Sequence, residues 1–404
     1  MKKRYYFLDV FRGATVALMI LVNNPGSWGH MYAPLKHASW HGVTPTDLVF
    51  PFFLFAVGNA MAFVMPRLRE AGEGVFLGKV IKRSILIFLI GLFLSWWPFV
   101  SWSGDSLVFR EWVNSENPES GVRILGVLQR IAIAYFLASI LVFYLKDRAL
   151  ILISGLILLV YWWLCWFFGK GDPYSLAGWF GTEIDKDVLG VAHMYKGEGV
   201  PFDPEGLVST LPAVIQVVFG YLAGRLIRME GDIKGILWGK LPATDNGQYR
   251  LVAVMMVLGF LGIVLGWTWS LGFPLNKKIW TSSYVLYTTG LGMLTIGGMI
   301  WFIEVCKAKN FVTRFFDVFG KNLLFIFVLS GLLPRLLGLI RIPNGVNASG
   351  EQLYITPFNW FYQNVCVPIG GPAEFGSFLY ALFFMVFMWA IVYWMDKKNI
   401  YIKV

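Results

Sequence analysis

The chain has 404 residues, of which 57% are hydrophobic and only 14% charged, whereas soluble domains average about 25% charged residues. Its net charge of +10 does not indicate a nucleic-acid partner, because most Lys and Arg residues flank apolar segments instead of forming a basic module interleaved with aromatic residues. These numbers exclude an ordinary soluble domain. They predict an all-α, polytopic transmembrane helix bundle, with residues 1–404 forming one domain.

The N-terminus imitates a secretory signal peptide, since Met1-Lys2-Lys3-Arg4 precedes an apolar stretch. However, Asp9 and Arg12 interrupt the start of that stretch. Asn23-Asn24-Pro25 then stands where a small-residue cleavage site would be expected. We therefore expect a retained first helix.

Apolar runs long enough to cross a bilayer recur from one end of the chain to the other. We expect about ten spans, at residues 8–24, 47–66, 82–101, 123–145, 149–168, 209–228, 250–271, 280–305, 315–340 and 374–395. The larger loops on the outer side are then 25–46, 102–122, 169–208 and 341–373.

An even number of spans places both termini on one side of the membrane. Every segment on that side is rich in Lys and Arg, so the positive-inside rule assigns it to the cytoplasm. The predicted location is the inner (plasma) membrane, with cytoplasmic N- and C-termini. Segment 229–249 mixes charges with apolar residues and is typical of an amphipathic stretch at the cytoplasmic interface.

This topology puts all four histidines, His30, His37, His41 and His193, on the outer side. We expect no metal site. His37 and His41 stand four residues apart, but the Glu of a His-Glu-x-x-His motif is absent. The three cysteines, Cys165, Cys306 and Cys366, form no disulfide framework and no metal-ligand spacing.

The first outer loop combines His37 with Asn23 and Asp47, which end span one and begin span two. Histidine suits acyl transfer because its ordinary pKa near 6.5 lets it act as a base or nucleophile at neutral pH. Asp47 would orient the imidazole, and Asn23 would donate to an oxyanion. The structural alternatives are an interfacial loop histidine, a helix N-terminal cap at Asp47 and a helix-end cap at Asn23.

Charged and polar side chains within the spans are candidates for holding an anionic cofactor. Arg130 with Gln129 lies inside span four, where a charge usually faces a cavity or a partner. Arg12 lies three residues after Asp9, so it either forms a simple ion pair or meets a phosphate. Lys321 and Asn322 form a similar pair near the start of span nine.

The outer segment 181–212 brings carboxylates and aromatic residues together, as sugar binding requires. Solvated loop charge is the alternative explanation. The candidate substrate-binding residues are Asp185, His193, Asp203, Glu205 and, from the first loop, His41. No Walker loop, dinucleotide fingerprint or Gly-x-Ser-x-Gly elbow is present in the sequence.

These segments, taken in order, resemble the heparan-α-glucosaminide N-acetyltransferase family and its bacterial relatives. The matching motifs are Leu8-Asp9-Val10-Phe11-Arg12-Gly13, Val22-Asn23, His37-Ala38-Ser39-Trp40-His41-Gly42, Asp47-Leu48-Val49-Phe50-Pro51, Gly126-Val127-Leu128-Gln129-Arg130, Asp203-Pro204-Glu205-Gly206, Phe273-Pro274-Leu275-Asn276-Lys277 and Gly320-Lys321-Asn322. The His-Ala-Ser-Trp and Asp-Pro-Glu-Gly pieces are the specific ones.

The resemblance implies a membrane acetyltransferase. It would take acetyl-CoA from the cytoplasm and acetylate the amine of a glucosamine-type sugar on the far side. The family's active-site histidine matches His37, and its catalytic asparagine matches Asn23. The sequence departs from the lysosomal members at His41, where they have Asn, and in its ten expected spans instead of eleven. Free glucosamine or a wall-derived amino sugar is therefore the expected acceptor.

The expected partners are acetyl-CoA, a small amino sugar and the lipid bilayer, with homodimer formation left open and no nucleic acid. Two other functions stay open at this point. One is a transporter or flippase for an amino sugar or lipid-linked glycan, which would also explain a buried Arg130. The other is a membrane O-acetyltransferase acting on wall polysaccharide.

Overall fold

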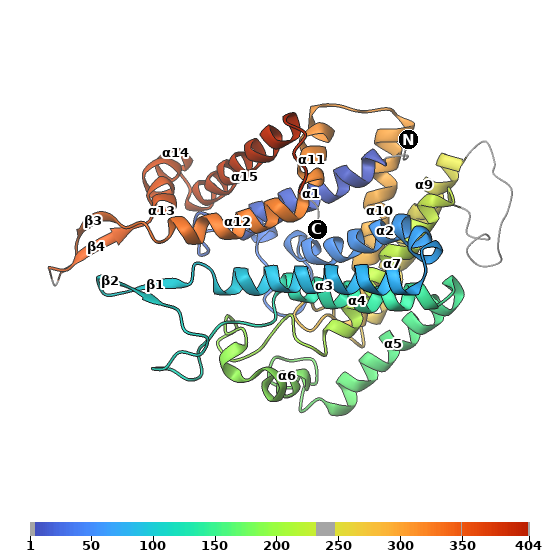
Figure 1. Ribbon diagram of the computed structural model, residues 1–404, viewed down its shortest axis with the longest axis horizontal. Coiled ribbons are helices and arrows are strands. Elements are labelled where there is room, and N and C mark those ends of the chain that lie inside the picture. Colours follow the sequence, from blue (N-terminus) through green and yellow to red (C-terminus); the bar gives the residue numbers. More distant parts are fainter. Residues whose placement is uncertain (1–4, 232–246, 349, 403–404) are drawn as a thin grey trace.

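The computed structural model describes residues 5–231, 247–348 and 350–402, which form a bundle of long helices with short hairpins (Figure 1). Most of the expected amphipathic segment 229–249 lies outside these residues, as do Lys2, Lys3 and Arg4. In Figure 1 the two hairpins project from the left-hand end of the bundle, opposite the N-terminus.

A helix stands at each of the ten expected spans, with boundaries shifted by up to nine residues at one end. The helices are α1 (Tyr6–Asn23), α2 (Val49–Glu70), α3 (Glu73–Trp96), α4 (Val127–Tyr144), α5 (Asp147–Phe168), α7 (Thr210–Arg228), α9 (Gly247–Trp269), α10 (Ser282–Ile300), the pair α11 (Phe311–Lys321) and α12 (Leu323–Leu337), and α15 (Ala373–Lys397).

Among the described residues, eight helices are long and apolar enough to cross a membrane, or up to nine if a bent pair counts as one span. The bent pair is α11 and α12, which meet at 81°. The span expected at 315–340 thus corresponds to a broken pair of helices, because the chain turns at Asn322. Helix α3 is long as well, but Lys79, Lys82 and Arg83 confine its apolar part to its second half.

The loops at the hairpin end hold more structure than an all-α prediction foresees. Strands β1 (Val100–Ser103) and β2 (Ser106–Phe109) form one antiparallel hairpin, and β3 (Ile342–Val346) and β4 (Gln352–Ile355) form another. The loop of the second hairpin also contains the helices α13 (Pro357–Phe361) and α14 (Val367–Gly370) and the short turn η5 (Tyr362–Cys366). The loop between α5 and α7 contains the helix α6 (Gly181–Leu189) and the turn η3 (Val191–His193), and the loop between α1 and α2 contains the turns η1 (Ala33–Leu35) and η2 (Pro45–Leu48).

Glycines allow the helices at the centre of the bundle to approach closely. A Cβ on Gly58 of α2 would lie 2.0 Å from the Val217 carbonyl oxygen of α7, and a Cβ on Gly13 of α1 would lie 1.7 Å from the Phe316 carbonyl oxygen of α11. Small residues serve this purpose in membrane bundles, where van der Waals packing drives helix association. The crossing of α1 and α11 fixes α1, whose two ends carry candidate residues.

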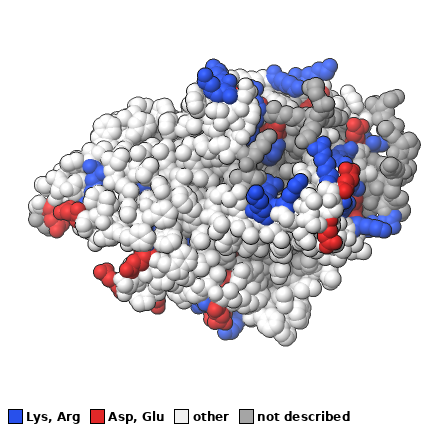
Figure 2. All heavy atoms as spheres, viewed as in Figure 1, with Lys and Arg blue, Asp and Glu red and all other residues white. Residues whose placement is uncertain are grey.

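Charge is distributed unevenly over the molecule. On the face shown in Figure 2, Lys and Arg side chains are most numerous toward the upper right, whereas the left-hand end, where the hairpins project, carries mainly acidic side chains. This distribution agrees with the basic bias on which the predicted orientation depends.

The Gly13 contact predicts a stability difference between two helical glycines. Replacing Gly13 with Ala should destabilise the protein by about 1–3 kcal/mol, because α11 must move to accommodate the new methyl group. Gly78→Ala in α3 is the control, since nothing lies within 4 Å of a Cβ there. Thermal unfolding in detergent, followed by tryptophan fluorescence, measures both. Equal melting temperatures would contradict the close crossing.

Candidate functional site

The carboxylate of Asp47 organises the end of the bundle where the first loop meets α2. Its Oδ2 accepts hydrogen bonds from the Ala38 amide (3.0 Å), the Thr44 amide (3.1 Å) and the Thr44 hydroxyl (3.0 Å). Its Oδ1 lies 2.6 Å from Nδ1 of His37. The side chain is only 2% exposed. Asp47 therefore caps the turn η2, which starts at Pro45, and also holds His37.

This contact defines the state of the imidazole. An ionised carboxylate only accepts hydrogen bonds, so Nδ1 of His37 carries the proton and donates it to Asp47. Nε2 is then the nitrogen with the free lone pair. The His37 side chain is 43% exposed, so the imidazole is accessible to solvent. The pair has the arrangement of a carboxylate-oriented general base.

His37 lines a pocket of about 210 Å³, here called the His37 pocket, between the first loop, segment 195–205 and the connection from α9 to α10. Two cations of that connection reach the first loop. Lys277 Nζ lies 3.2 Å from His37 Nδ1 and 3.5 Å from Asp47 Oδ1. The lining residues are His37, Ala38, Trp40, Gly42, Asp47, Arg123, Val127, Tyr195, Glu198, Pro204, Glu205, Lys277, Lys278 and Trp280.

Backbone and side-chain bonds dock the first loop onto its neighbours. Lys278 Nζ donates to the Ser39 carbonyl and to Glu198, each at 2.6 Å. Trp40 Nε1 donates to the Tyr174 carbonyl at 2.7 Å, and the Gly42 amide donates to the Leu275 carbonyl at 2.8 Å. The wall that carries His37 is thus fixed from both sides.

Arg123 closes the opposite wall through an ion pair with two carboxylates. It binds Asp203 through two nitrogens, at 2.5 and 3.1 Å, and also contacts Glu205. Burial alone would raise the pKa of Glu205, but Arg123, Arg130 and Lys277 together lower it. Glu205 lines the pocket as a carboxylate, whereas Asp203 lies fully buried behind it.

Arg130 lies beneath this wall. It is fully buried and donates to the Gly206 carbonyl at 3.2 Å and to the Ser209 hydroxyl. Its guanidinium lies 5.2 Å from the centre of the Trp280 ring. Its Nε and Nη1 have no hydrogen-bond partner within the part of the chain that the structure describes. Arg130 supports the Asp203–Ser209 turn and does not line the His37 pocket.

Asn23 lines a second pocket of about 350 Å³, the Asn23 pocket, which lies among α1, α3, α4 and α12. It includes Gln129, whose buried Nε2 has no partner among the described residues, and Arg335. The two pockets share Arg123 and Val127. The structure therefore brings Asn23 together with Gln129, and no hydrogen bond joins Asn23 to His37 in the described ranges.

Four of the five expected substrate-binding residues, namely His193, His41, Asp185 and the buried Asp203, line none of the described pockets. His193 donates from Nδ1 to the Val122 carbonyl at 2.7 Å and packs on Trp112, so it anchors a loop. His41 is exposed beside Asn276, and partial burial lowers its pKa. Asp185 is buried, and its Oδ1 accepts from the Leu207 amide at 2.9 Å. Of the expected substrate set, Glu205 alone is among the residues that line the His37 pocket.

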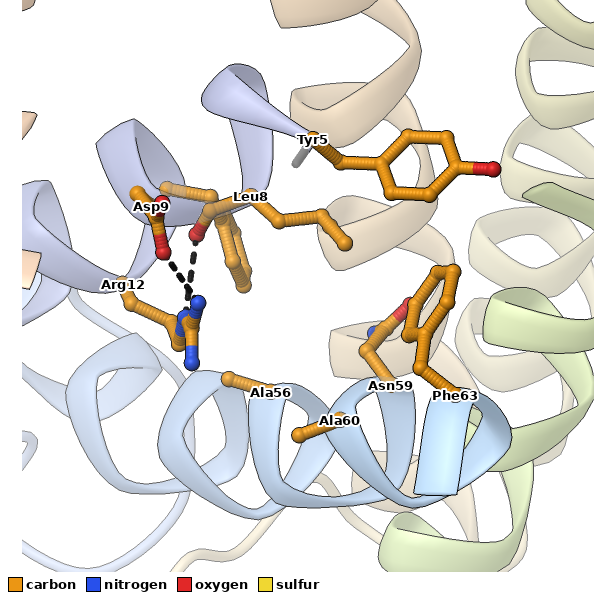
Figure 3. Close-up of a pocket in the computed structure, with 9 residues that line it drawn as sticks. Tyr5, Leu8, Asp9, Arg12, Ala56, Asn59, Ala60 and Phe63 are labelled. Carbon is orange, nitrogen blue, oxygen red and sulfur yellow. Dashed lines mark hydrogen bonds and ion pairs between the residues drawn. The ribbon is translucent and has the colours of Figure 1, made fainter. Parts of the chain in front are cut away.

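Arg12 lies on α1 far from these pockets and lines another of about 240 Å³, the Arg12 pocket (Figure 3). Its guanidinium binds Asp9 and the Leu8 carbonyl. In Figure 3 Asn59 of α2 lies across the cavity from Asp9, beside Phe63. The buried Oδ1 of Asn59 has no hydrogen-bond partner among the described residues. A cation, a carboxamide and aromatic rings thus surround one cavity.

Lys321 and Asn322 do not line the Arg12 pocket. Lys321 binds Asp396 at 2.8 Å and Asp317 at 3.0 Å. The Asn322 side chain donates to the Ile400 carbonyl at 3.0 Å and accepts from the Ile402 amide at 2.9 Å. These bonds fasten the C-terminal residues to the break between α11 and α12.

The residues that sequence reasoning missed are chiefly Lys277 and Arg123. Lys277 stands in a matching family motif that gives it no role, and no motif of the sequence singles out Arg123. Their partners lie 240 and 80 residues away in the sequence, so no local pattern reveals them. Within the described residues, no group of three or more His, Cys, Asp or Glu side chains is arranged to hold a metal ion.

The apolar helices and the imidazole–carboxylate pair define a multi-pass membrane-type bundle with an acid–base site at one end. No protein-family model matches the chain. It is 29% identical over 329 residues to heparan-alpha-glucosaminide N-acetyltransferase of Mus musculus, which covers 69% of this chain and 46% of that protein. It is 28% identical over 328 residues to the Homo sapiens enzyme of the same name, covering 69% and 45%.

These alignments confirm the resemblance to the heparan-α-glucosaminide N-acetyltransferase family. The matched region is less than half the length of either curated relative.

Asp185 predicts a pH-dependent stability. Burial raises the pKa of this carboxyl to about 7, although the Leu207 amide opposes the shift. A raised pKa in the folded state means that the contribution to stability is complete at acid pH and is lost as pH rises through about 7. Asp185→Asn should therefore raise the melting temperature at pH 8 relative to wild type, and less so at pH 5. A constant difference across this range would contradict the assignment.

Proposed function

We propose that the protein is a transmembrane N-acetyltransferase that moves an acetyl group from cytoplasmic acetyl-CoA to the amine of a glucosamine-type sugar on the outer side. The observation that carries this proposal is the 2.6 Å contact between His37 Nδ1 and Asp47, which leaves Nε2 as the reactive nitrogen. The names of the two matched relatives supply the reaction class.

Two routes use the same imidazole. In direct transfer, Nε2 removes a proton from the sugar ammonium, and the amine attacks the thioester carbonyl as the carbon–sulfur bond breaks. In the covalent route, Nε2 attacks the thioester carbonyl first and CoA leaves as the thiolate. The deprotonated amine then attacks the acetyl-imidazolium, the bond from Nε2 to the acetyl carbon breaks, and the proton that the amine loses neutralises the thiolate. Both routes need neutral His37, and Asp47 stabilises the imidazolium that forms when Nε2 accepts a proton.

The Asn23 pocket is the proposed place for the reacting thioester. Amide donors from Asn23 and Gln129 line it, and such donors stabilise the oxyanion of an acyl-transfer intermediate. Its shared wall with the His37 pocket brings donor and acceptor together at Arg123 and Val127. The acceptor sugar would occupy the His37 pocket, beside Glu205 and the rings of Trp40 and Tyr195.

The Arg12 pocket is the proposed place for the nucleotide end of CoA. Arg12 can pair with a phosphate, and the aromatic rings and the unpaired Asn59 oxygen suit a nucleobase. Eleven residues of α1 separate Arg12 from Asn23, which is about 16 Å of helix rise that the extended arm of CoA would follow. Arg130, Lys321 and Asn322 support the walls of these sites in this proposal.

A transporter would also need pockets toward both ends of the bundle, and this arrangement is its support. It requires no reactive imidazole held by a buried carboxylate. An O-acetyltransferase would use the same site with a hydroxyl acceptor, and it would yield an ester where the proposed enzyme yields an amide.

The proposal predicts release of CoA that depends on the sugar. Purified protein given acetyl-CoA and glucosamine should release CoA and form an amide, and His37→Ala should lower the rate at least about 100-fold, as loss of a general base does. His30→Ala is the matched control, because His30 is exposed and lines none of the described pockets. Transport of the sugar without CoA release would replace the acetyltransferase with the transporter.

The Arg12 assignment predicts an effect on one substrate. Arg12→Gln should raise the KM for acetyl-CoA about tenfold or more, since a hydrogen bond to a charged group contributes about 1.5–3 kcal/mol. The KM for glucosamine should not change. Arg67→Gln, at the exposed end of α2, controls for loss of general positive charge. Equal effects of the two variants would remove Arg12 from the donor site.

A further inference from the structure

Lys277 holds a position that the reaction described above does not use. Its Nζ lies 3.2 Å from His37 Nδ1 and 3.5 Å from Asp47 Oδ1, the same oxygen that binds the imidazole. Its side chain is 22% exposed, so the ammonium is largely shielded from solvent. The adjacent Lys278 turns to Glu198 and the Ser39 carbonyl instead.

The backbone around Lys277 fixes this position. Asn276 is fully buried, and its side-chain oxygen accepts from the Ile279 amide at 3.0 Å. The backbone N–H of Asn276 donates to the Thr281 hydroxyl at 3.0 Å, and its backbone carbonyl accepts from the Thr281 backbone N–H at 3.0 Å. The connection between α9 and α10 is thus a closed turn that presents Lys277 to the first loop.

An ammonium and a protonated Nδ1 are both donors, so they do not bond to each other and instead share Asp47 as their acceptor. The carboxylate would otherwise stabilise the imidazolium of His37 alone. A cation placed within about 4 Å of the ring disfavours a second positive charge there. Burial lowers the pKa of Lys277 itself, and the attraction of Asp47 and Glu205 opposes that change.

Other charges around His37 are already paired. Glu205 binds Arg123, and Glu198 binds Lys278. Among the residues that the structure describes, Asp47 and Lys277 are therefore the charged groups in direct contact with the imidazole.

We infer that Lys277 is a positioning residue that acts through Asp47 to keep His37 neutral and protonated on Nδ1, and so sets the lower pH limit of the reaction. This inference rests on the proposed acetyl transfer. It adds a third member to the His37–Asp47 pair.

The test is the pH profile of kcat/KM for glucosamine in the purified full-length protein. In Lys277→Met, Asp47 stabilises the imidazolium without opposition, so His37 becomes charged at higher pH. The acid limb should move upward by about one pH unit or more. Lys277→Arg keeps the cation and should keep the limb near its wild-type position. Lys196→Met, with the same loss of charge at an exposed residue that lines none of the described pockets, should leave the limb in place.

A matching measurement needs no activity. The protein has four histidines, so the 15N-labelled imidazole signal of His37 can be assigned by its loss in His37→Ala and then titrated. Its midpoint should move upward in Lys277→Met and not in Lys196→Met. An unmoved midpoint in a folded Lys277→Met protein overturns the inference, as does a lower kcat with an unmoved acid limb. Absence of CoA release by wild type refutes the proposed function instead, and the titration still decides the role of Lys277.

Discussion

The His37 pocket depends on one buried carboxylate. Asp47 is almost fully removed from solvent at the start of α2, and a charge in such a place is tolerated only when it is paired and hydrogen-bonded. Its partners come from the first loop, from its own turn and from the connection between α9 and α10. One side chain therefore joins the first loop and the turn before α2 to a connection that is distant in sequence. The position of His37 is a consequence of this requirement, because the imidazole satisfies part of it.

The same rule shapes the rest of the pocket. Arg123 satisfies Asp203 and Glu205, and Lys278 satisfies Glu198, so each cation of the lining faces a carboxylate. A lining whose charges are mutually neutralised suits a ligand rich in hydroxyl groups better than a strongly charged one. Arg123 also lines the Asn23 pocket, so its ion pairs fix a side chain that the two pockets share. Pairing of charges thus holds the walls of both pockets in place.

The sequence predicts the helices well because long apolar runs can satisfy their backbone only as helices in a membrane. It also predicts the contact of His37 with Asp47, since the two are only 10 residues apart along one loop. It does not predict the break at Asn322, because side-chain bonds to the C-terminal residues 400 and 402 fix that turn. The separation of Asn23 from His37 and the arrival of Lys277 likewise depend on contacts between distant segments. Lys321 illustrates the limit, since a cation near a span predicts a polar partner but does not identify Asp396.

Residues along one face of helix α1 line separate cavities near its two ends. Arg12, Thr15, Met19 and Asn23 are spaced by three or four residues, so they lie along one face of this helix. Arg12 and Thr15 line a small cavity with Arg83 and Leu323, and Met19 and Asn23 line the Asn23 pocket. A donor that is cytoplasmic at one end and reactive at the other needs such a continuous wall. A carrier must instead move its whole cargo past that wall, and Gly13 on α1 and Gly320 on α11 pack backbone against backbone at this helix. The tight packing of α1 therefore favours the proposed acetyltransferase, in which the long arm of CoA lies along a fixed helix, over a transporter, in which a whole sugar must pass that helix.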